Sequence, residues 1–263
     1  MVEVEHLHHL RHIHIVQLVG TYLHRSNFAI LLYPCADYNL TTFLEDTFDL
    51  GHLSSSSGQW LERAAFLGSS FGCLTHALEY IHARSTKHMD IKSANILVKE
   101  IPATLRKSRC HKFRIYIADF GLSRSFASVG HSQSDGPTSR TPKYCAPEVY
   151  NFDMRGRSAD VFSLRCVYLE ILTVLSGQSL DDFAAYRRGD NSDGSFHKNL
   201  IRVNKWFDYL LKWPFFADPK AYGFIRPMIS EAPTERPTAT RLAEFLRNSS
   251  ISSSMFESRT MLF

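Results

Sequence analysis

Residues 88–95 read HMDIKSAN and concentrate a histidine, an aspartate, a lysine and an asparagine in one short segment. Apolar residues recur at steps of three and four through residues 60–84, which predicts a long helix just before this segment. Two short apolar runs follow it, at 95–98 and 114–118, and we expect them to form a small strand pair. The triplet Asp119-Phe120-Gly121 comes directly after the second run. The polar segment is therefore expected between a helix and a strand pair.

The chain before this segment has the pattern of a small part that contains β-structure. We interpret residues 2–10 as the end of a short helix. Residues 15–34 are rich in β-branched and aromatic side chains, and the polar break at 25–27 predicts a hairpin of two strands. Asn39 is expected to cap a short helix that runs through Leu44.

The chain after this segment has the pattern of a mainly helical body. Ser158 begins a second strong helix with one apolar face, and residues 196–247 look helical with proline breaks. Serines and glycines dominate residues 123–139, which we expect to form a loop. The aromatic residues of the last third are expected in the core, among them Trp213, Phe215 and Phe216.

Composition places the chain among globular proteins. It has 263 residues, 44% apolar and 21% charged, which excludes a disordered, collagen-like or coiled-coil chain. The net charge of +4 is too weak to argue for nucleic acid, and we interpret the basic residues 106–109 as a solvated loop. The five cysteines form no CxxC pair and are expected to be reduced thiols.

No membrane segment or leader is expected either. The start, MVEVEHLHHL, lacks the basic and apolar regions of a signal peptide. The most apolar stretch, residues 161–175, contains Arg165 and Glu170 and is shorter than the roughly 18–20 residues of a membrane span. We therefore expect an intracellular protein, cytoplasmic or nuclear, without a membrane or nucleic-acid partner.

Three motifs in order identify a family resemblance. The segment HMDIKSAN, the triplet Asp119-Phe120-Gly121 and the later Ala146-Pro147-Glu148 resemble the motifs of the eukaryotic protein kinase family. The family's catalytic loop is H-R-D-x-x-x-x-N, and this chain has every fixed residue except the arginine, which Met89 replaces. Each fixed residue would match by chance about one time in twenty, so three ordered motifs are specific. The resemblance runs from Glu3 to about Leu246, and the segment RHIHIVQLVGTY is most similar to stand-alone fungal kinases.

The resemblance implies roles for the polar side chains. Asp90 would accept the proton of the substrate hydroxyl, and Lys92 would stabilise the charge that builds on the transferred phosphoryl group. Asn95 and Asp119 would hold Mg²⁺ through hard oxygen ligands. Lys92 also resembles serine/threonine kinases, as does Thr141 in the segment Thr141-Pro142-Lys143-Tyr144.

Other positions would bind the adenine of ATP or support the fold. The Tyr33 carbonyl and the Cys35 amide would bond the adenine edge, with Leu32 as gatekeeper and Leu97 as the apolar floor. By the same resemblance, an apolar spine would stand on Asp160 and consist of Leu7, Leu18, Phe120 and His88. Glu148 would pair with Arg236, and breaking such a buried pair from one side costs on the order of 3–5 kcal/mol.

The chain departs from the family pattern in its first part. Glu3 stands where the family has its helix-C glutamate, but the chain contains no G-x-G-x-x-G and no strand lysine before that position. Adenine would then have a floor without a roof, and a strand at 15–22 or 27–33 would have an exposed edge. Two explanations stay open: a truncated chain or incomplete gene model, or a degenerate kinase used for binding.

Two single residues also differ from the family. With Met89 in place of the arginine, phosphorylation of the loop at Ser128, Ser132 or Thr138 could not switch the site by the family's route. Arg165 stands where the family prefers glycine, and a buried cation there would be destabilising unless it reaches solvent or a carboxylate.

Two other kinds of site are less favoured by the sequence. Histidines crowd the start of the chain, and His8 and His12 would be one helical turn apart, which allows a zinc site, although an exposed polar face is favoured. The residues that could take part are His6, His8, His9, His12 and His14. A hydrolytic dyad of His88 and Asp90 is disfavoured because Asn95 and Asp119 match the kinase pattern as well.

The sequence thus predicts an α+β, protein kinase-like fold with a truncated small β lobe and a mainly α-helical large lobe. We expect a remnant of the small lobe at 1–34, the hinge and large lobe at 35–248, and a flexible tail at 249–263. The expected function is transfer of the ATP γ-phosphoryl group to serine or threonine hydroxyls of protein substrates. The alternative is a non-catalytic pseudokinase or kinase fragment that binds proteins. The oligomeric state is left open.

Overall fold

Two long helices form the centre of the helical body. In the computed structural model, α3 spans Gly58–Ala83 and α5 spans Ser158–Leu175, so both predicted helices are confirmed. They pack directly, because the Tyr168 hydroxyl donates to the Phe71 carbonyl at 2.9 Å and the two rings lie 4.6 Å apart. The side chains of α5 are buried on nearly every side, so the single apolar face that its sequence suggested is wrong. A helix buried all round forms the core of a larger domain.

The structure describes residues 7–25, 27–53, 57–106, 111–121, 124–125, 142–151, 156–212 and 225–248, with only the backbone at 124–125. Several predictions fall outside these ranges. They are the expected positions of Glu3, His6, Ser128, Ser132, Thr138, Thr141, Trp213, Phe215 and Phe216, the tail at 249–263, and most of the loop at 123–139. Within that loop only residues 124–125 are described, and they form a short strand instead of loop because they pair with residues 86–87.

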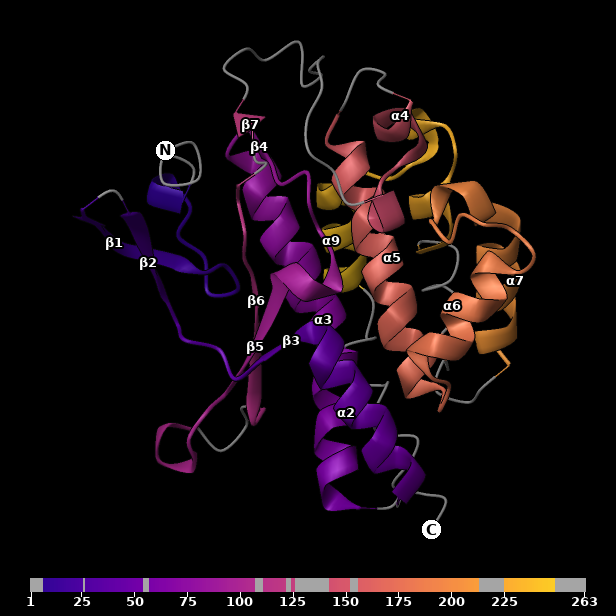
Figure 1. Cartoon of the computed structure of the whole chain (residues 1–263), viewed down its shortest axis with the longest axis horizontal. Coiled ribbons are helices and arrows are strands. Elements are labelled where there is room, and N and C mark those ends of the chain that lie inside the picture. The colour runs from indigo at the N-terminus through magenta and orange to yellow at the C-terminus, as the bar shows by residue number, and fades with distance from the viewer. Residues whose placement is uncertain are drawn as a thin grey trace.

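Shorter helices surround the two central ones (Figure 1). Asn39 caps α2 as predicted, because its side-chain oxygen accepts from the Thr42 amide at 3.0 Å, but the helix continues well beyond Leu44. The other α-helices are α2 (Leu40–Leu53), α4 (Pro147–Tyr150), α6 (Leu180–Arg188), α7 (Leu200–Leu210) and α9 (Ala239–Asn248). The 3-10 turns are η1 (Ser93–Asn95), η2 (Ala103–Leu105), η3 (Pro142–Tyr144), η4 (His197–Asn199), η5 (Arg226–Ile229) and η6 (Pro233–Glu235).

A small antiparallel sheet lies against the helical body. Its order is β3 (Tyr38–Asn39), β5 (Ile96–Glu100) and β6 (Phe113–Ile117). The register pairs Ile96 with Ile117, which confirms the predicted strand pair. A second ladder joins the short strands β4 (Thr86–Lys87) and β7 (Arg124–Ser125). The sheet therefore holds β5, which follows residues 88–95, beside β6, which precedes residues 119–121.

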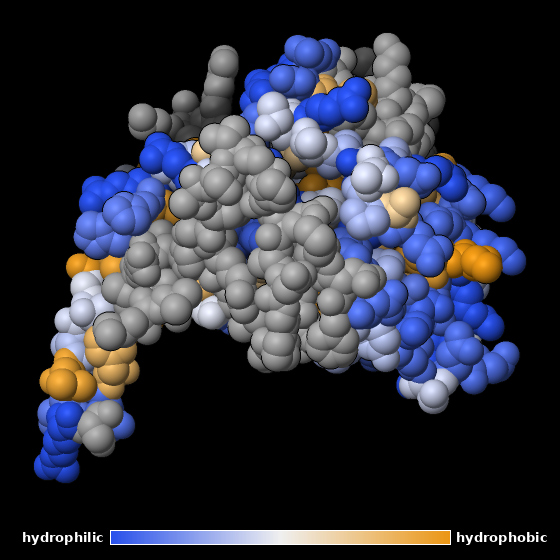
Figure 2. Space-filling view, turned by 90° about the horizontal axis from the view of Figure 1, so that it is seen from above, coloured by the Kyte–Doolittle hydropathy of each residue, from blue (hydrophilic) through white to orange (hydrophobic). Residues whose placement is uncertain are grey.

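The predicted hairpin forms and stands apart from the helical body. β1 (Gln17–His24) pairs with β2 (Asn27–Tyr33) in an antiparallel register. At its foot, the Val16 amide donates to the Ile117 carbonyl at 3.0 Å and the Ile117 amide donates to the His14 carbonyl at 2.9 Å. Figure 2 shows the hairpin projecting from the body, with apolar side chains open to solvent. The exposed apolar residues include Val19, Tyr22, Leu23, Phe28, Leu31 and Tyr33.

The histidines near the start of the chain do not lie on one helical face. The helical residues described there end at His9, so His8 and His12 are not one turn apart on a helix, as the zinc interpretation required. Within the described ranges no group of three His, Cys, Asp or Glu side chains is arranged to hold a metal ion. Nor do those ranges contain a helix long and apolar enough to span a bilayer.

Arg165 is entirely buried in α5. Its Nη1 donates to the Ile225 carbonyl at 3.1 Å, and its guanidinium lies 4.1 Å from the centre of the Phe207 ring. Its Nε and Nη2 have no hydrogen-bond partner in the part of the chain that the structure describes. The side chain therefore reaches neither solvent nor, among those residues, a carboxylate, and burial lowers the pKa of the guanidinium to about 9.

Candidate functional site

The segment between β4 and β5 brings three of the predicted residues into contact. The Lys92 Nζ lies 2.7 Å from Asp90 Oδ2. The Asn95 side-chain Nδ2 donates both to Asp90 Oδ2 at 2.9 Å and to the Asp90 carbonyl at 3.0 Å. The turn η1 makes these contacts possible, because it folds residues 93–95 back toward the aspartate. Asp90 is thus held by a cation and an amide while its side chain keeps about 10% of its surface exposed.

A backbone hydrogen bond of the neighbouring Ala118 brings Asp119 close to the turn that carries Asn95. The Ala118 amide donates to the Asn95 carbonyl at 2.9 Å, so the end of β6 lies against η1. Asp119 and Met89 have φ values of 64° and 69°, the left-handed region that is strained for such residues. Gly121 follows closely, and a Cβ there would lie 3.3 Å from Asp119 Oδ1. A larger residue at 121 would therefore press on the carboxylate.

A buried aspartate at the start of α5 supports the loop from below. Asp160 accepts from the His88 and Met89 amides at 2.9 and 2.8 Å, and its Oδ2 lies 3.0 Å from His82 Nε2. Burial opposes ionisation of Asp160, but the contact with His82 and the hydrogen bond donated by the Met89 amide outweigh it and lower the pKa of the carboxyl group. The ionised carboxylate therefore fixes the loop immediately before Asp90.

His88 is a structural residue in this arrangement. It is fully buried, its ring lies 4.6 Å from the Phe120 ring, and burial lowers its pKa. A neutral imidazole fits its contacts, since Nε2 lies 3.0 Å from the Ala118 carbonyl and Nδ1 accepts from the Asp90 amide at 3.3 Å. Both nitrogens are occupied, so a hydrolytic dyad with Asp90 has no free base. Of the other predicted spine residues, Leu7 lies in the same hydrophobic core as Phe120, and the partly buried Leu18 packs against that core.

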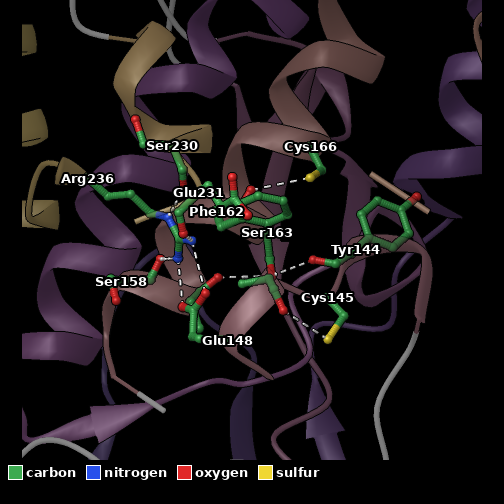
Figure 3. A network of polar contacts seen from close by, with 12 residues as sticks. Tyr144, Cys145, Glu148, Ser158, Phe162, Ser163, Cys166, Ser230, Glu231 and Arg236 are labelled. Carbon is green, nitrogen blue, oxygen red and sulfur yellow. Dashed lines mark hydrogen bonds and ion pairs between the residues drawn. The ribbon is translucent and has the colours of Figure 1, made fainter. Parts of the chain in front are cut away.

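The predicted pair of Glu148 and Arg236 is confirmed (Figure 3). The guanidinium donates to both carboxylate oxygens, at 2.7 and 2.9 Å. It also donates to the carbonyls of Ser158, Ser230 and Glu231. This contact fastens α4, and with it the segment from Tyr144 to Ala146, to the helical body.

A second network, around Glu170 of α5, was not predicted. The Glu170 carboxylate is 2% exposed, and its Oε1 lies 2.8 Å from the Lys143 Nζ. The Tyr144 hydroxyl donates to both of its oxygens, and the Ser93 hydroxyl donates to Oε2. Burial and the adjacent carboxylate raise the pKa of Tyr144 well above its ordinary value, so it stays a donor. The one available signal was an acidic residue inside an otherwise apolar helix, which needs a partner.

The residues expected to contact adenine lie where the hairpin meets the small sheet. Tyr33 ends β2 with 62% of its surface exposed, and Cys35 is exposed after it. The Asp37 amide donates to the Val98 carbonyl at 3.0 Å, so this connection runs beside β5. Leu97 of β5 is half-buried and points away from the side that buries Ile96 and Val98.

Comparison with known proteins agrees with this architecture. The family model for the protein kinase domain matches residues 1–245. The chain is 34% identical over 179 residues to a receptor-like protein kinase of Arabidopsis thaliana, covering 65% of this chain and 18% of that protein. It is 29% identical over 245 residues to mitogen-activated protein kinase kinase kinase A of Dictyostelium discoideum, covering 91% of this chain and 21% of that protein. Over 171 residues it is 29% identical to mitogen-activated protein kinase kinase kinase 1 of Rattus norvegicus, covering 64% and 10%.

The match of the family model over residues 1–245 identifies the class of protein as a protein kinase domain. The chain belongs to the protein kinase family, and its fold is the α+β fold that the sequence predicted. It spans about a fifth or less of the length of these relatives. Members of the family use ATP and Mg²⁺ and act on protein substrates.

Proposed function

We propose that this domain transfers the γ-phosphoryl group of ATP to serine or threonine hydroxyls of proteins. Asp90 is the group that orients the acceptor hydroxyl and takes its proton. Lys92, 2.7 Å from Asp90, supplies positive charge beside the phosphoryl group as negative charge develops there. The serine/threonine assignment is supported by Lys92 itself and by relatives that are mitogen-activated protein kinase kinase kinases.

Asn95 and Asp119 are the side chains that would hold Mg²⁺. The Asn95 Nδ2 is engaged with Asp90, which leaves its amide oxygen as the atom able to ligate a metal. With the Asp119 carboxylate this gives two hard oxygen ligands, and Mg²⁺ ordinarily completes its shell with water and phosphate oxygens. When bound, the ion would neutralise phosphate charge. The donor set therefore fits this metal.

The nucleotide base would be bound at the junction of hairpin and sheet. The Tyr33 carbonyl and Cys35 amide would bond the adenine edge, and the half-buried Leu97 would pack beneath the ring. On this proposal residues 1–34 are the remnant of the small lobe, 35–248 the hinge and large lobe, and 249–263 a tail.

The observation that carries the proposal is the joint placement of Asp90, Lys92 and Asn95 beside the end of β6, where Asp119 follows. The test is transfer of labelled phosphate from ATP with Mg²⁺ to one basic and one acidic generic protein. We expect incorporation into serine and threonine by the unaltered chain, and at least about a hundred-fold less with Asp90→Asn or Asp119→Asn. Equal incorporation with the unaltered chain and with both variants would rule out the proposed site.

A non-catalytic, protein-binding role is the second candidate. It is favoured by the exposed apolar hairpin and by the lack of any G-x-G-x-x-G in the chain, which leaves the phosphates of a nucleotide without a backbone cradle. Nucleotide binding separates the two candidates. Calorimetric titration with ATP and Mg²⁺ should show saturable binding that Asp119→Asn weakens if the first is right, and no heat of binding if the second is.

A further inference from the structure

Glu170 is a carboxylate beside the candidate site that already has its full set of partners. Lys143, Tyr144 and Ser93 all contact its two oxygens. Ser93 is in the turn that carries Asn95, and Lys143 is in η3, so the network joins the Asp90 loop to the segment at 142–146. A cationic group arriving from solvent would find this carboxylate occupied.

Lys143 is the exposed end of this network. Its side chain is 43% exposed, whereas Glu170 is 2% exposed. Its Nζ also lies 4.9 Å from the centre of the Tyr144 ring. The backbone is held independently of the side chain, because the Phe196 amide donates to the Lys143 carbonyl at 2.9 Å. A change of this side chain should therefore leave the local backbone in place.

The segment that follows Lys143 borders Asp90. Tyr144, Cys145 and Ala146 line a narrow cavity of about 20 Å³ together with Asp90 and Ile91. Asp90 is itself paired with Lys92. Asp90 and Glu170 are thus each paired with a lysine, and the side chain of Lys143 is more exposed than that of Lys92, 43% against 20%.

We propose that Lys143 is a specificity-determining residue that favours acceptor peptides with an acidic side chain near the hydroxyl and disfavours basic ones. The inference rests on the proposed function, because Asp90 marks where the acceptor hydroxyl lies. An aspartate or glutamate of the peptide gains an ion pair with the ammonium of this partly exposed side chain. A lysine or arginine there meets like charge and no available carboxylate at Glu170. A pair at such exposure corresponds to about a three-fold to five-fold preference.

The test measures binding rather than catalysis. Labelled ten-residue peptides with one serine carry either two aspartates or two lysines at the same positions beside it, and affinities are measured by fluorescence anisotropy at low and high salt. We expect the unaltered chain to bind the acidic peptide about three to five times more tightly, and the difference to shrink in high salt. Lys143→Glu should reverse the preference. Lys143→Gln, which brings no new charge next to Glu170, should abolish it.

The control is Lys205→Glu, which changes the net charge of the chain equally at an exposed position of α7. It should keep the preference of the unaltered chain. The proposal is overturned if the unaltered chain binds both peptides equally, binds neither, or prefers the basic one, or if Lys205→Glu and Lys143→Glu act alike. The readout is peptide binding and not phosphate transfer. A chain that transfers no phosphate but keeps the peptide preference would therefore contradict the proposed function and not the role of Lys143.

Discussion

Two arginines are buried in the same helical body, Arg165 within α5 and Arg236 between η6 and α9, and their surroundings are opposite. Arg236 is matched by both oxygens of Glu148 and by three backbone carbonyls. Arg165 has one carbonyl and an aromatic ring, and two of its nitrogens lack a hydrogen-bond partner within the described ranges. The first guanidinium fastens the segment beside the candidate site, while the second sits where the family prefers glycine.

The difference indicates which buried charges hold the fold. A buried ion is stabilising only when its partners replace the lost water, so removing one partner of Arg236 should be costly. For Arg165 the desolvation is poorly compensated, so removing the charge itself should be favourable. Neither outcome follows from burial alone.

The largest expected change in stability is at the ion pair of Glu148 and Arg236. Glu148→Ala should lower the free energy of unfolding by about 3–5 kcal/mol, because it leaves the Arg236 charge buried without its carboxylate. Urea denaturation followed by circular dichroism measures this. Glu235→Ala, at an exposed glutamate next to Arg236 in sequence, is the control and should change stability by less than about 0.5 kcal/mol. Similar values for both variants would show that the pair is not the fastening contact.

Removal of the Arg165 charge is expected to increase stability. Arg165→Met keeps an unbranched apolar side chain against Phe207 and removes the poorly compensated charge, so it should raise the free energy of unfolding by about 1–3 kcal/mol. The midpoint of thermal unfolding should rise accordingly. Arg241→Met, at an exposed arginine of α9, should leave it nearly unchanged. A destabilised Arg165→Met would mean that the guanidinium has partners worth more than its desolvation.

His88 is a buried group that is hydrogen-bonded in its neutral form, so its contribution to stability depends on pH. Burial lowers the pKa of His88 below the ordinary 6.5, so in mild acid the unfolded chain binds the proton more readily than the folded chain. Stability contributed by this residue is therefore present above about pH 6.5 and is lost as the pH falls, by at most about 1.4 kcal/mol per pH unit.

Denaturation at pH 7, 6 and 5 tests this expectation. His88→Phe keeps a ring against Phe120 but loses the hydrogen bonds of the imidazole, so it should be less stable than the unaltered chain at pH 7. Because phenylalanine cannot take up a proton, the variant should also lose less stability toward pH 5. An identical pH dependence in both proteins would assign the acid sensitivity elsewhere, for instance to His12 and His14, whose pKa values burial also lowers.

Local patterns predicted those parts of the fold that depend on neighbouring residues. The recurrence of Leu67, Phe71 and Leu74 was enough for α3, and the two apolar runs were enough for β5 and β6. Burial of α5 on all sides could not be predicted from periodicity, because it depends on several elements that pack around the helix. The length of α2 was also missed beyond its cap.

In the candidate site as well, the sequence predicted the residues of a local motif but not a contact between distant residues. Asp90, Lys92 and Asn95 are close in sequence, and the kinase motif predicted their roles together with Asp119. The contact between Glu170 and Lys143 joins residues 27 positions apart, and no local pattern connects them. Their pairing became visible only once α5 and η3 were placed in space.

The hairpin of β1 and β2 has a consequence for how the molecule loses structure. Its strands are paired with each other and are tied to the sheet by a few backbone bonds at the foot. A lone two-stranded ribbon is marginal in water. Amide hydrogens of residues 18–32 should therefore exchange with deuterium far sooner than those of α3 and α5, and heating should melt the ribbon ahead of the helices, as two separate cooperative units.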